Sequence, residues 1–438
     1  MAKNGNSNTG RLRAGVASVD ITPTSSIAMQ GYGLRNSEGV SDPLFASALA
    51  VGSKELEWVL LCVDVIGMDR SLTHRIRQSL SEQLSLPASA ITIVCSHTHS
   101  GPAVLPRLGP VDADDSYLQF LREKLVAVAQ TAAKDLTTAR WRFGMTSSLE
   151  NINRREWQHG KVVLGVDPSG PVDNRLRVVR IDRADATSDS VPLAIIVHYA
   201  CHPTISAGEP RISADWPGMM RKRIQETYMG SVVCFLQGCA GDITHRIGRD
   251  QATWPQHFGQ KTSVQALVMG QLIASAAIEA SQYATEFSAE EVHTSVQSFD
   301  LPFHDADGRE QVELQVVRIG PSALERDAAT ESTWLIGLPG EPFSTYGTDL
   351  GGLFHRRLGA AEDRVLACGY TNDCVGYFCT KDALRLGGYE ADSAHEIYHR
   401  PAAFSADTEE IILQRSLEAA DALLLDTVDS EPSASTRG

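Results

Sequence analysis

The chain has 438 residues, of which 42% are hydrophobic and 21% charged, a globular composition that excludes disorder over most of its length. A formal net charge of −15 argues against nucleic acid or an anionic membrane as partner, because both repel such a surface. The start lacks the apolar core of a signal peptide and no run approaches the ~20 apolar residues of a membrane span, so we expect a cytoplasmic protein without a transmembrane segment.

Short β-branched runs alternate with helical patterns along the chain, and the strands are apolar enough to be covered on both faces. We therefore predict one large α/β domain over 12–426, a mixed β-sheet covered by helices, between flexible termini at 1–11 and 427–438. In chain order we expect strand 58–66, helix 70–84, strand 91–95, helix 117–136, a further strand near 140–144, strand 193–199, helix 217–228, strand 231–236, helix 264–280, further strands near 292–319, strand 333–338, helix 345–358, strand 364–368 and helix 409–425.

Polar residues gather where five of these strands end. Ligands of α/β sheets bind beyond the carboxyl ends of the strands, where the connecting loops converge. Loops rich in His, Asp, Glu, Gly and Pro therefore predict one site at this edge. The five loops are SHTHSGP after ITIVC, CHPT after LAIIVHYA, QGCAGDIT after VVCFL, PGE after WLIGL and YTNDCVGY after VLACG.

His97 and His99 are two residues apart just after a strand, so on an extended backbone both imidazoles face one cleft. An isolated H-x-H is more often a hydrogen-bonding pair, but the glycine and proline that follow favour a metal site. His202 follows another apolar strand and precedes a proline that holds it extended. His198 lies deeper in that strand and is interpreted as a core histidine.

Glu341 lies between a strand and a helix, where a carboxylate is costly without charged partners, although a helix cap is an alternative. Asp242 and Thr244 follow a buried strand in GCAGDITHR, where Gly238 and Gly241 allow backbone N–H groups to approach an oxyanion. A tight turn capped by Asp242 explains the same residues equally well. There is no G-x-S-x-G, so we predict no Ser-His-Asp triad.

Two histidines, one carboxylate and an open position are typical of hydrolytic zinc sites, where the metal polarises a carbonyl and activates water. The sequence has no G-x-G-x-x-G after the first strand and no P-loop motif, which argues against dehydrogenases and kinases. The eight cysteines include no C-x-x-C pair, and several lie in apolar runs, so we expect reduced, buried thiols.

The order of these motifs resembles the catalytic domain of the neutral/alkaline (non-lysosomal) ceramidase family, amidases of sphingolipid metabolism that split ceramide into sphingosine and fatty acid. The resemblance covers nearly the whole chain, and its strength lies in the shared order of weak motifs. They are AGVASVDITP, GYG at 31–33, SHTHSGP at 96–102, NINRR at 151–155, VDNRLRVVRI at 172–181, ACHPT at 200–204, GCAGDIT at 238–244, LPGE at 338–341, TNDCVGYFCT at 371–380 and GGYEADS up to 393.

The resemblance implies a Zn²⁺ cofactor and a set of residues that the motifs alone do not assign. It places zinc on His97, His202, Glu341 and Tyr377; without it, Tyr377 reads as a packed core tyrosine. It also implies that His99, Arg154 and Tyr389 are catalytic or bind substrate. We expect His99 to shuttle a proton while Arg154 and Tyr389 stabilise the oxyanion or anchor the substrate, with Asp242 and Thr244 as further catalytic candidates.

The sequence also departs from the family pattern. Family members carry a C-terminal β-sandwich, whereas this chain ends about 60 residues after Tyr377, so we expect none. Cys374 stands where the family has a tyrosine, and Thr244 replaces a serine. The substrate therefore stays open between ceramide or a similar N-acyl lipid and a small polar amide or ester. A non-catalytic binding protein is the remaining alternative, and the oligomeric state is open.

Overall fold

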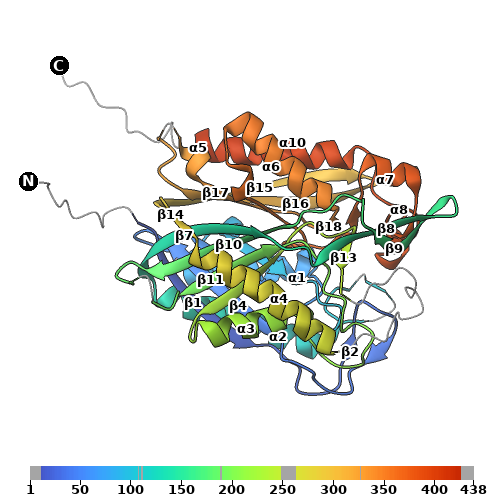
Figure 1. The fold of residues 1–438 in the computed structure, drawn as a ribbon, viewed down its shortest axis with the longest axis horizontal. Coiled ribbons are helices and arrows are strands. Elements are labelled where there is room, and N and C mark those ends of the chain that lie inside the picture. The colour runs from blue at the N-terminus through green and yellow to red at the C-terminus, as the bar shows by residue number, and fades with distance from the viewer. Residues whose placement is uncertain are drawn as a thin grey trace, which may run out of the picture.

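Apolar strands from both halves of the chain build two β-sheets that pack face to face in a computed structural model of the protein. The structure describes residues 11–106, 108–109, 112–187, 190–247, 263–325 and 327–425. The expected flexible termini at 1–11 and 427–438 lie outside these ranges except for Arg11. The two sheets form the middle of four layers, and helices cover both outer faces (Figure 1).

The larger sheet has nine strands within the described ranges, and both of its ends carry a parallel pair. β5 runs parallel to β6 at one end and β11 parallel to β12 at the other, while the strands between them are antiparallel. The order is β12-β11-β10-β7-β1-β4-β5-β6, with β14 paired to β7. The bounds are β1 (Arg13–Asp20), β4 (Phe45–Gly52), β5 (Trp58–Val63), β6 (Ile91–Cys95), β7 (Thr137–Ser147), β10 (Arg175–Arg183), β11 (Ala194–Tyr199), β12 (Val232–Gln237) and β14 (Thr285–Phe287).

The smaller sheet joins a long hairpin to two parallel strands in the order β15-β16-β17-β19. Short pairings outside these sheets bring distant loops together. The bounds are β15 (Glu291–Pro302), β16 (Arg309–Gly320), β17 (Thr333–Gly337) and β19 (Val365–Cys368), with β8 (Asn151–Gln158) between β13 (Ile243–His245) and β9 (Lys161–Asp167), β18 (Glu341–Pro342) beside β20 (Tyr377–Phe378), and β2 (Ala28–Met29) beside β3 (Arg35–Asn36).

The helices lie over the outer faces of the two sheets. On the larger sheet, α2 packs against β1 and β4, α3 against β12, and α4 against β7 and β10; on the smaller sheet α6 packs against β19 and α10 against β15 and β16. The bounds are α1 (Arg70–Leu84), α2 (Asp115–Lys134), α3 (Asp215–Thr227), α4 (Ser263–Gln282), α5 (Ala328–Glu331), α6 (Ser344–Leu358), α7 (Lys381–Leu386), α8 (Tyr389–Asp392), α9 (Ala394–Ile397) and α10 (Thr408–Leu425), with 3-10 turns at Ala88–Ala90 and Glu362–Arg364.

One helix of the described chain, α4, is long and apolar enough to cross a membrane by length and composition alone. Ala266, Ile273 and Ala277 on its buried face are inaccessible to solvent, and the helix packs against α3 and the larger sheet. Helices that pack on a β-sheet can meet the same criteria of length and composition, so this property of α4 is weak evidence for a membrane span.

The predicted α/β class is confirmed, and each predicted helix and strand has a counterpart within a few residues. The thiols of all eight cysteines are free and buried, as expected for reduced core residues. The interpretation of His198 as a core histidine is also confirmed. Its Nε2–H donates to Ala367 O at 2.9 Å, which links the larger sheet to the smaller one.

Candidate metal centre

His97 lies directly after β6, at the edge where the parallel strands end. The turn is held by neighbouring backbone, since Ser96 N donates to Val63 O at 2.9 Å and His97 N to Val65 O at 3.0 Å. The extended backbone predicted here is wrong. His97 has φ 65°, a left-handed conformation that costs a residue with a Cβ about 1–2 kcal/mol. Such strain persists where the surrounding structure fixes it, as it does at binding sites.

His202 follows β11, and its ring is oriented by the loop after β12. Its Nδ1–H donates to Ala240 O at 2.6 Å and lies 3.1 Å from Ile243 O, so Nε2 carries the lone pair. That Nε2 atom is buried and has no aligned hydrogen-bond partner, although Glu341 Oε2 lies 3.3 Å away. A buried nitrogen in this state is costly unless a cation or a proton meets it.

Glu341 and Tyr377 are brought side by side by the short parallel pair β18–β20, in which they are directly opposite in register. Glu341 N donates to Gly376 O at 2.9 Å. The helix-cap alternative for Glu341 is wrong, because α6 begins later and the backbone N–H of its first residue, Ser344, is bonded by Asp242 instead. The carboxylate points into the site.

Two phenols that the sequence did not single out hold the Glu341 carboxylate. Tyr370 Oη donates to Oε2 at 3.2 Å, and Tyr398 Oη donates to Oε1. The Tyr370 ring also stacks on His97, with centroids 3.9 Å apart. Tyr370 begins the YTNDCVGY loop quoted from the sequence, but neither tyrosine was named there as a site residue.

The side chains of four residues converge beside the Glu341 carboxylate. They are His97, His99, His202 and Glu341 itself. His97 Nδ1–H donates to Ile66 O at 2.6 Å, and His99 Nδ1 lies 3.3 Å from Gly31 O, so both rings present Nε2 to the site. The two Nε2 atoms are 3.0 Å apart, and His97 Nε2 is 3.3 Å from Glu341 Oε2. Such close atoms repel one another unless a proton or a metal ion lies among them, and this set of nitrogen and carboxylate donors fits a divalent metal ion.

Burial and neighbouring charges shift the pKa values of several of these side chains. Burial lowers the pKa of His202 to about 4, and burial together with the neighbouring His97 lowers that of His99 well below its usual range. Burial alone would raise the pKa of Glu341, but the facing His97 and His202 hold it well below the ordinary value. Burial and Glu341 raise the pKa of Tyr377 well above its ordinary value, although the nearby Arg154 acts in the opposite direction.

Arg154 approaches the site from β8. Its Nη2 donates to Tyr377 Oη at 3.1 Å, and its Nε donates to the buried Glu390 at 2.8 Å. The guanidinium also lies 5.7 Å from the centre of the Tyr377 ring and 6.0 Å from that of Tyr389. Glu390 binds Arg155 as well, at 2.5 Å, so it fixes the cation in place. The sequence named Arg154 and Tyr389 but missed Glu390, which stands beside Tyr389 in the quoted GGYEADS motif.

Asp242 and Thr244 lie behind the site rather than in it. Asp242 accepts hydrogen bonds from Ser344 N at 2.7 Å, Ser344 Oγ at 3.0 Å and Asn153 Nδ2 at 2.9 Å, and burial raises its pKa to about 6. Thr244 is buried in β13 opposite Ile152. Both oxygens of Asp242 serve to join β8 to the start of α6, and a catalytic role for either residue stays a prediction.

A cavity of about 280 Å³ opens beside the converging side chains. It is walled largely by aromatic and aliphatic groups, which suits an apolar part of a substrate. Tyr389 faces this cavity, whereas Arg154 reaches the site through Tyr377. The lining residues are Gln30, Gly31, Tyr32, Gly33, Ile66, His97, His99, Leu108, Gly109, Glu341, Tyr377, Tyr389, Ile397 and Tyr398.

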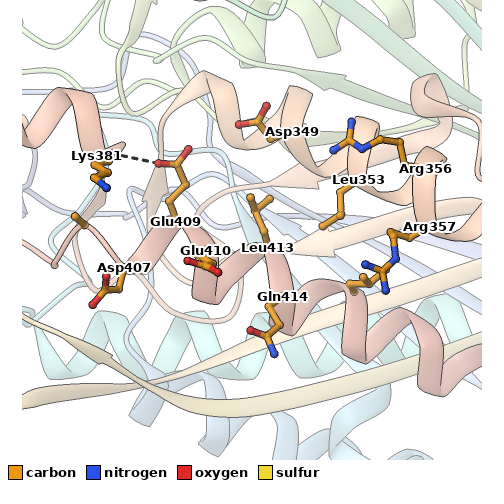
Figure 2. A pocket seen from close by; sticks show the side chains of 12 residues that line it. Asp349, Leu353, Arg356, Arg357, Lys381, Asp407, Glu409, Glu410, Leu413 and Gln414 are labelled. Carbon is orange, nitrogen blue, oxygen red and sulfur yellow. Dashed lines mark hydrogen bonds between the residues drawn. The ribbon is translucent and has the colours of Figure 1, made fainter.

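A second cavity, of about 530 Å³, lies between α6 and α10 (Figure 2). Arg356 and Arg357 stand at one end, while Asp407 and Glu410 lie toward the other, where Lys381 N donates to Glu409 at 3.2 Å. Both cations and carboxylates line it, and none of its described lining residues is a histidine, cysteine or tyrosine. Its chemistry is that of a solvated surface groove, so the cavity beside His97 is the candidate active site.

The chain was compared with known protein families and solved structures. Residues 12–264 match the family model described as "Neutral/alkaline non-lysosomal ceramidase, N-terminal". Among solved structures, the chain is similar to the neutral ceramidase from Pseudomonas aeruginosa, with a TM-score of 0.75 at 16% identity over 94% of this chain and 74% of that one. It is similarly close to a structure described as "Ceramidase complexed with C2", with a TM-score of 0.73 at 16% identity over 94% and 75% of the two chains. No curated protein matches the chain. At this identity the structural likeness establishes the fold.

Proposed function

The chain belongs to the neutral/alkaline non-lysosomal ceramidase family, and we propose that it is a zinc-dependent hydrolase that cleaves the amide bond of ceramide or a similar N-acyl compound. The observation that carries the proposal is the convergence of three imidazole Nε2 atoms and a carboxylate, with the ligand atoms of His97, His99 and His202 within 4.8 Å of one another. Nitrogen and carboxylate ligands of this kind suit Zn²⁺.

We assign the metal to His97, His202, Glu341 and Tyr377. An ion held there would polarise the amide carbonyl and lower the pKa of a water molecule, which makes water an effective nucleophile near neutral pH. The tautomers support this assignment, because both imidazoles use Nδ1–H on backbone carbonyls and present Nε2 to the ion. Tyr377 is the ligand that rests most on the family resemblance.

The remaining polar groups have distinct tasks in this proposal. His99 Nε2 accepts a proton from the attacking water and returns it to the departing amine nitrogen, whose bond to the acyl carbon breaks. Arg154 and Tyr389 stabilise the negative charge that develops on the carbonyl oxygen. Glu390 and Arg155 hold Arg154 in place, so the cation is oriented before the substrate binds. Water is the only co-reactant, and the products are an amine and a carboxylic acid.

The cavity also suits a second candidate substrate class, small N-acyl or O-acyl compounds. Its volume of about 280 Å³ is at the lower end of the range of roughly 300–1,000 Å³ usual for small-molecule sites. The apolar walls at Ile66, Leu108 and Ile397 accommodate the hydrocarbon part of either class.

The test is an assay of the zinc-loaded protein against sphingosine amides of increasing acyl length and a panel of small N-acyl and O-acyl compounds. We expect release of amine and acid that a chelator abolishes and Zn²⁺ restores.

His97→Ala should lose both bound zinc and activity. His293→Ala, a matched change on β15 where the imidazole pairs with Glu291, should retain both. Absence of hydrolysis of every substrate by the zinc-loaded protein would refute the enzyme assignment, and activity confined to the small N-acyl or O-acyl compounds would favour the second candidate.

A further inference from the structure

The GYG motif at 31–33 has no part in the mechanism above, yet its loop lies directly on His99. The segment leading into it runs along the chain that follows His99. Gln30 N donates to Gly101 O at 3.2 Å, Ala103 N donates to Ala28 O at 2.8 Å, and Met29 forms an isolated bridge with Pro102. The first glycine of the motif is thereby placed against the His99 ring.

Gly31 makes two kinds of contact with that ring. Its carbonyl oxygen lies 3.3 Å from His99 Nδ1 and accepts a hydrogen bond from the ring when the proton is on that nitrogen. A Cβ at Gly31 would fall 2.6 Å from Nδ1 and 2.7 Å from Cγ of the same ring, distances that real Cβ atoms do not show. The backbone also has φ +109°, which favours glycine. Any other residue at this position would push the imidazole away.

The loop is anchored on both sides of Gly31, so the position of its carbonyl is fixed. The buried Gln30 side chain accepts from Val104 N at 2.9 Å and from Leu105 N at 3.0 Å, and it donates to Leu105 O at 2.6 Å. On the other side, Arg35 donates to His99 O at 2.6 Å and to Tyr32 O. The Tyr32 ring packs against the His99 ring, with centroids 5.3 Å apart.

We propose that Gly31 is a positioning residue for the proton-transfer histidine. Its carbonyl holds the His99 proton on Nδ1 and thereby aims the Nε2 lone pair at the reaction site, and its missing side chain allows the loop to close on the ring. A base oriented by a fixed acceptor loses less entropy on reaching the transition state than a freely rotating one. The proposal rests on the function proposed above, in which His99 moves the proton.

The test compares Gly31→Ala with Gly230→Ala. Gly230 has a similar φ of +96° in an exposed turn, but a Cβ there meets nothing within 4 Å, so it controls for backbone strain. We expect kcat of Gly31→Ala to fall roughly 10–100-fold, with KM and zinc content unchanged, while Gly230→Ala retains the wild-type kcat. Equal kcat values for the two variants would overturn the proposal.

A second variant covers the case in which Gly31→Ala does not fold. Arg35→Ala releases the link between Tyr32 and His99 without adding an atom, and we expect kcat to fall with zinc content unchanged. A wild-type kcat in that variant would overturn the proposal.

An independent readout does not depend on activity. Nitrogen-15 NMR of histidine-labelled protein, with His99 assigned by its loss in His99→Gln, should show the proton on Nδ1 in wild type. A proton on Nε2 would overturn the inference even if the proposed hydrolysis is observed, and a proton on Nδ1 would support it even if the proposed substrates fail.

Discussion

Glu341 is a fully buried carboxylate with no lysine or arginine bonded to it in the described structure. Two phenols, Tyr370 and Tyr398, donate to it, while the Nε2 atoms of His97 and His202 face it at 3.3 Å without balancing its charge. A carboxylate placed this way needs a cation to repay its desolvation. The phenols fix the orientation of the oxygens, as expected for the hydrogen-bond partners of the proposed metal ligand Glu341.

Replacing Tyr398 by Phe should therefore weaken metal binding. The variant keeps the ring in its packing but leaves Glu341 Oε1 without its donor, so we expect the dissociation constant for zinc to rise about 10–100-fold. Competition with a chromophoric chelator measures this constant directly. Tyr346→Phe removes a buried hydroxyl bonded to Cys379 O at 3.4 Å and serves as the matched control. Equal zinc affinities for the two variants would show that Tyr398 does not orient Glu341.

At the scale of elements, long apolar strands and amphipathic helices were predictable because burial imposes their pattern. The longer strands that the sequence missed are β1, β4, β8, β9 and β10, in which small or charged residues blur the apolar alternation. Arg177 and Arg180, for example, are buried within β10, where periodicity alone indicates a polar surface.

The candidate site was predictable in part, because the buried strands that lead into it have a recognisable apolar pattern. His97, His202 and Glu341 could be found because they follow buried strands. Tyr377 needed the family resemblance, since its place beside Glu341 depends on a two-residue pairing between distant loops. The left-handed backbone at His97 has no signature in the sequence.

His198 on β11 donates a hydrogen bond to Ala367 O on β19, and its burial predicts that the stability of the fold depends on pH. Burial, reinforced by the nearby Arg177, lowers the pKa of this histidine from 6.5 to about 3. The unfolded chain therefore takes up the proton first as the pH falls. The contribution of the neutral ring is complete above about pH 6.5 and is lost progressively toward pH 3, a loss on the order of 2 kcal/mol at pH 5.

The measurement is the free energy of unfolding in urea at pH 7.5 and pH 5. His198→Gln retains an amide that can donate to Ala367 O but does not titrate, so the decrease between the two pH values should be smaller than in wild type by about 2 kcal/mol. If both proteins lose the same stability, His198 is not buried as a neutral ring.

At the scale of the whole molecule, the proposed ligands come from both sheets. His97 and His202 follow strands of the larger sheet, whereas Glu341 and Tyr377 follow strands of the smaller one. A bound ion would therefore join the two halves of the four-layer fold (Figure 1). Because the unfolded chain does not keep these four groups together, binding should stabilise the fold.

Removal of the metal should accordingly lower the melting temperature. At a free zinc concentration of 100 times the dissociation constant, the stabilisation is about 2.7 kcal/mol. Scanning calorimetry with and without a chelator measures the shift, and added Zn²⁺ should reverse it. In His97→Ala, the chelator should have a much smaller effect. A wild-type melting temperature that does not respond to chelation would indicate that no ion joins the two sheets.

The most direct test of the metal centre is anomalous X-ray scattering at the zinc edge from crystals of the zinc-loaded protein. We expect one peak about 2.0–2.2 Å from His97 Nε2, His202 Nε2 and a carboxylate oxygen of Glu341, with Tyr377 Oη facing it and one coordination position left to solvent. A peak elsewhere, or an ion fully enclosed by protein ligands, would contradict the assignment of this site to metal-assisted hydrolysis.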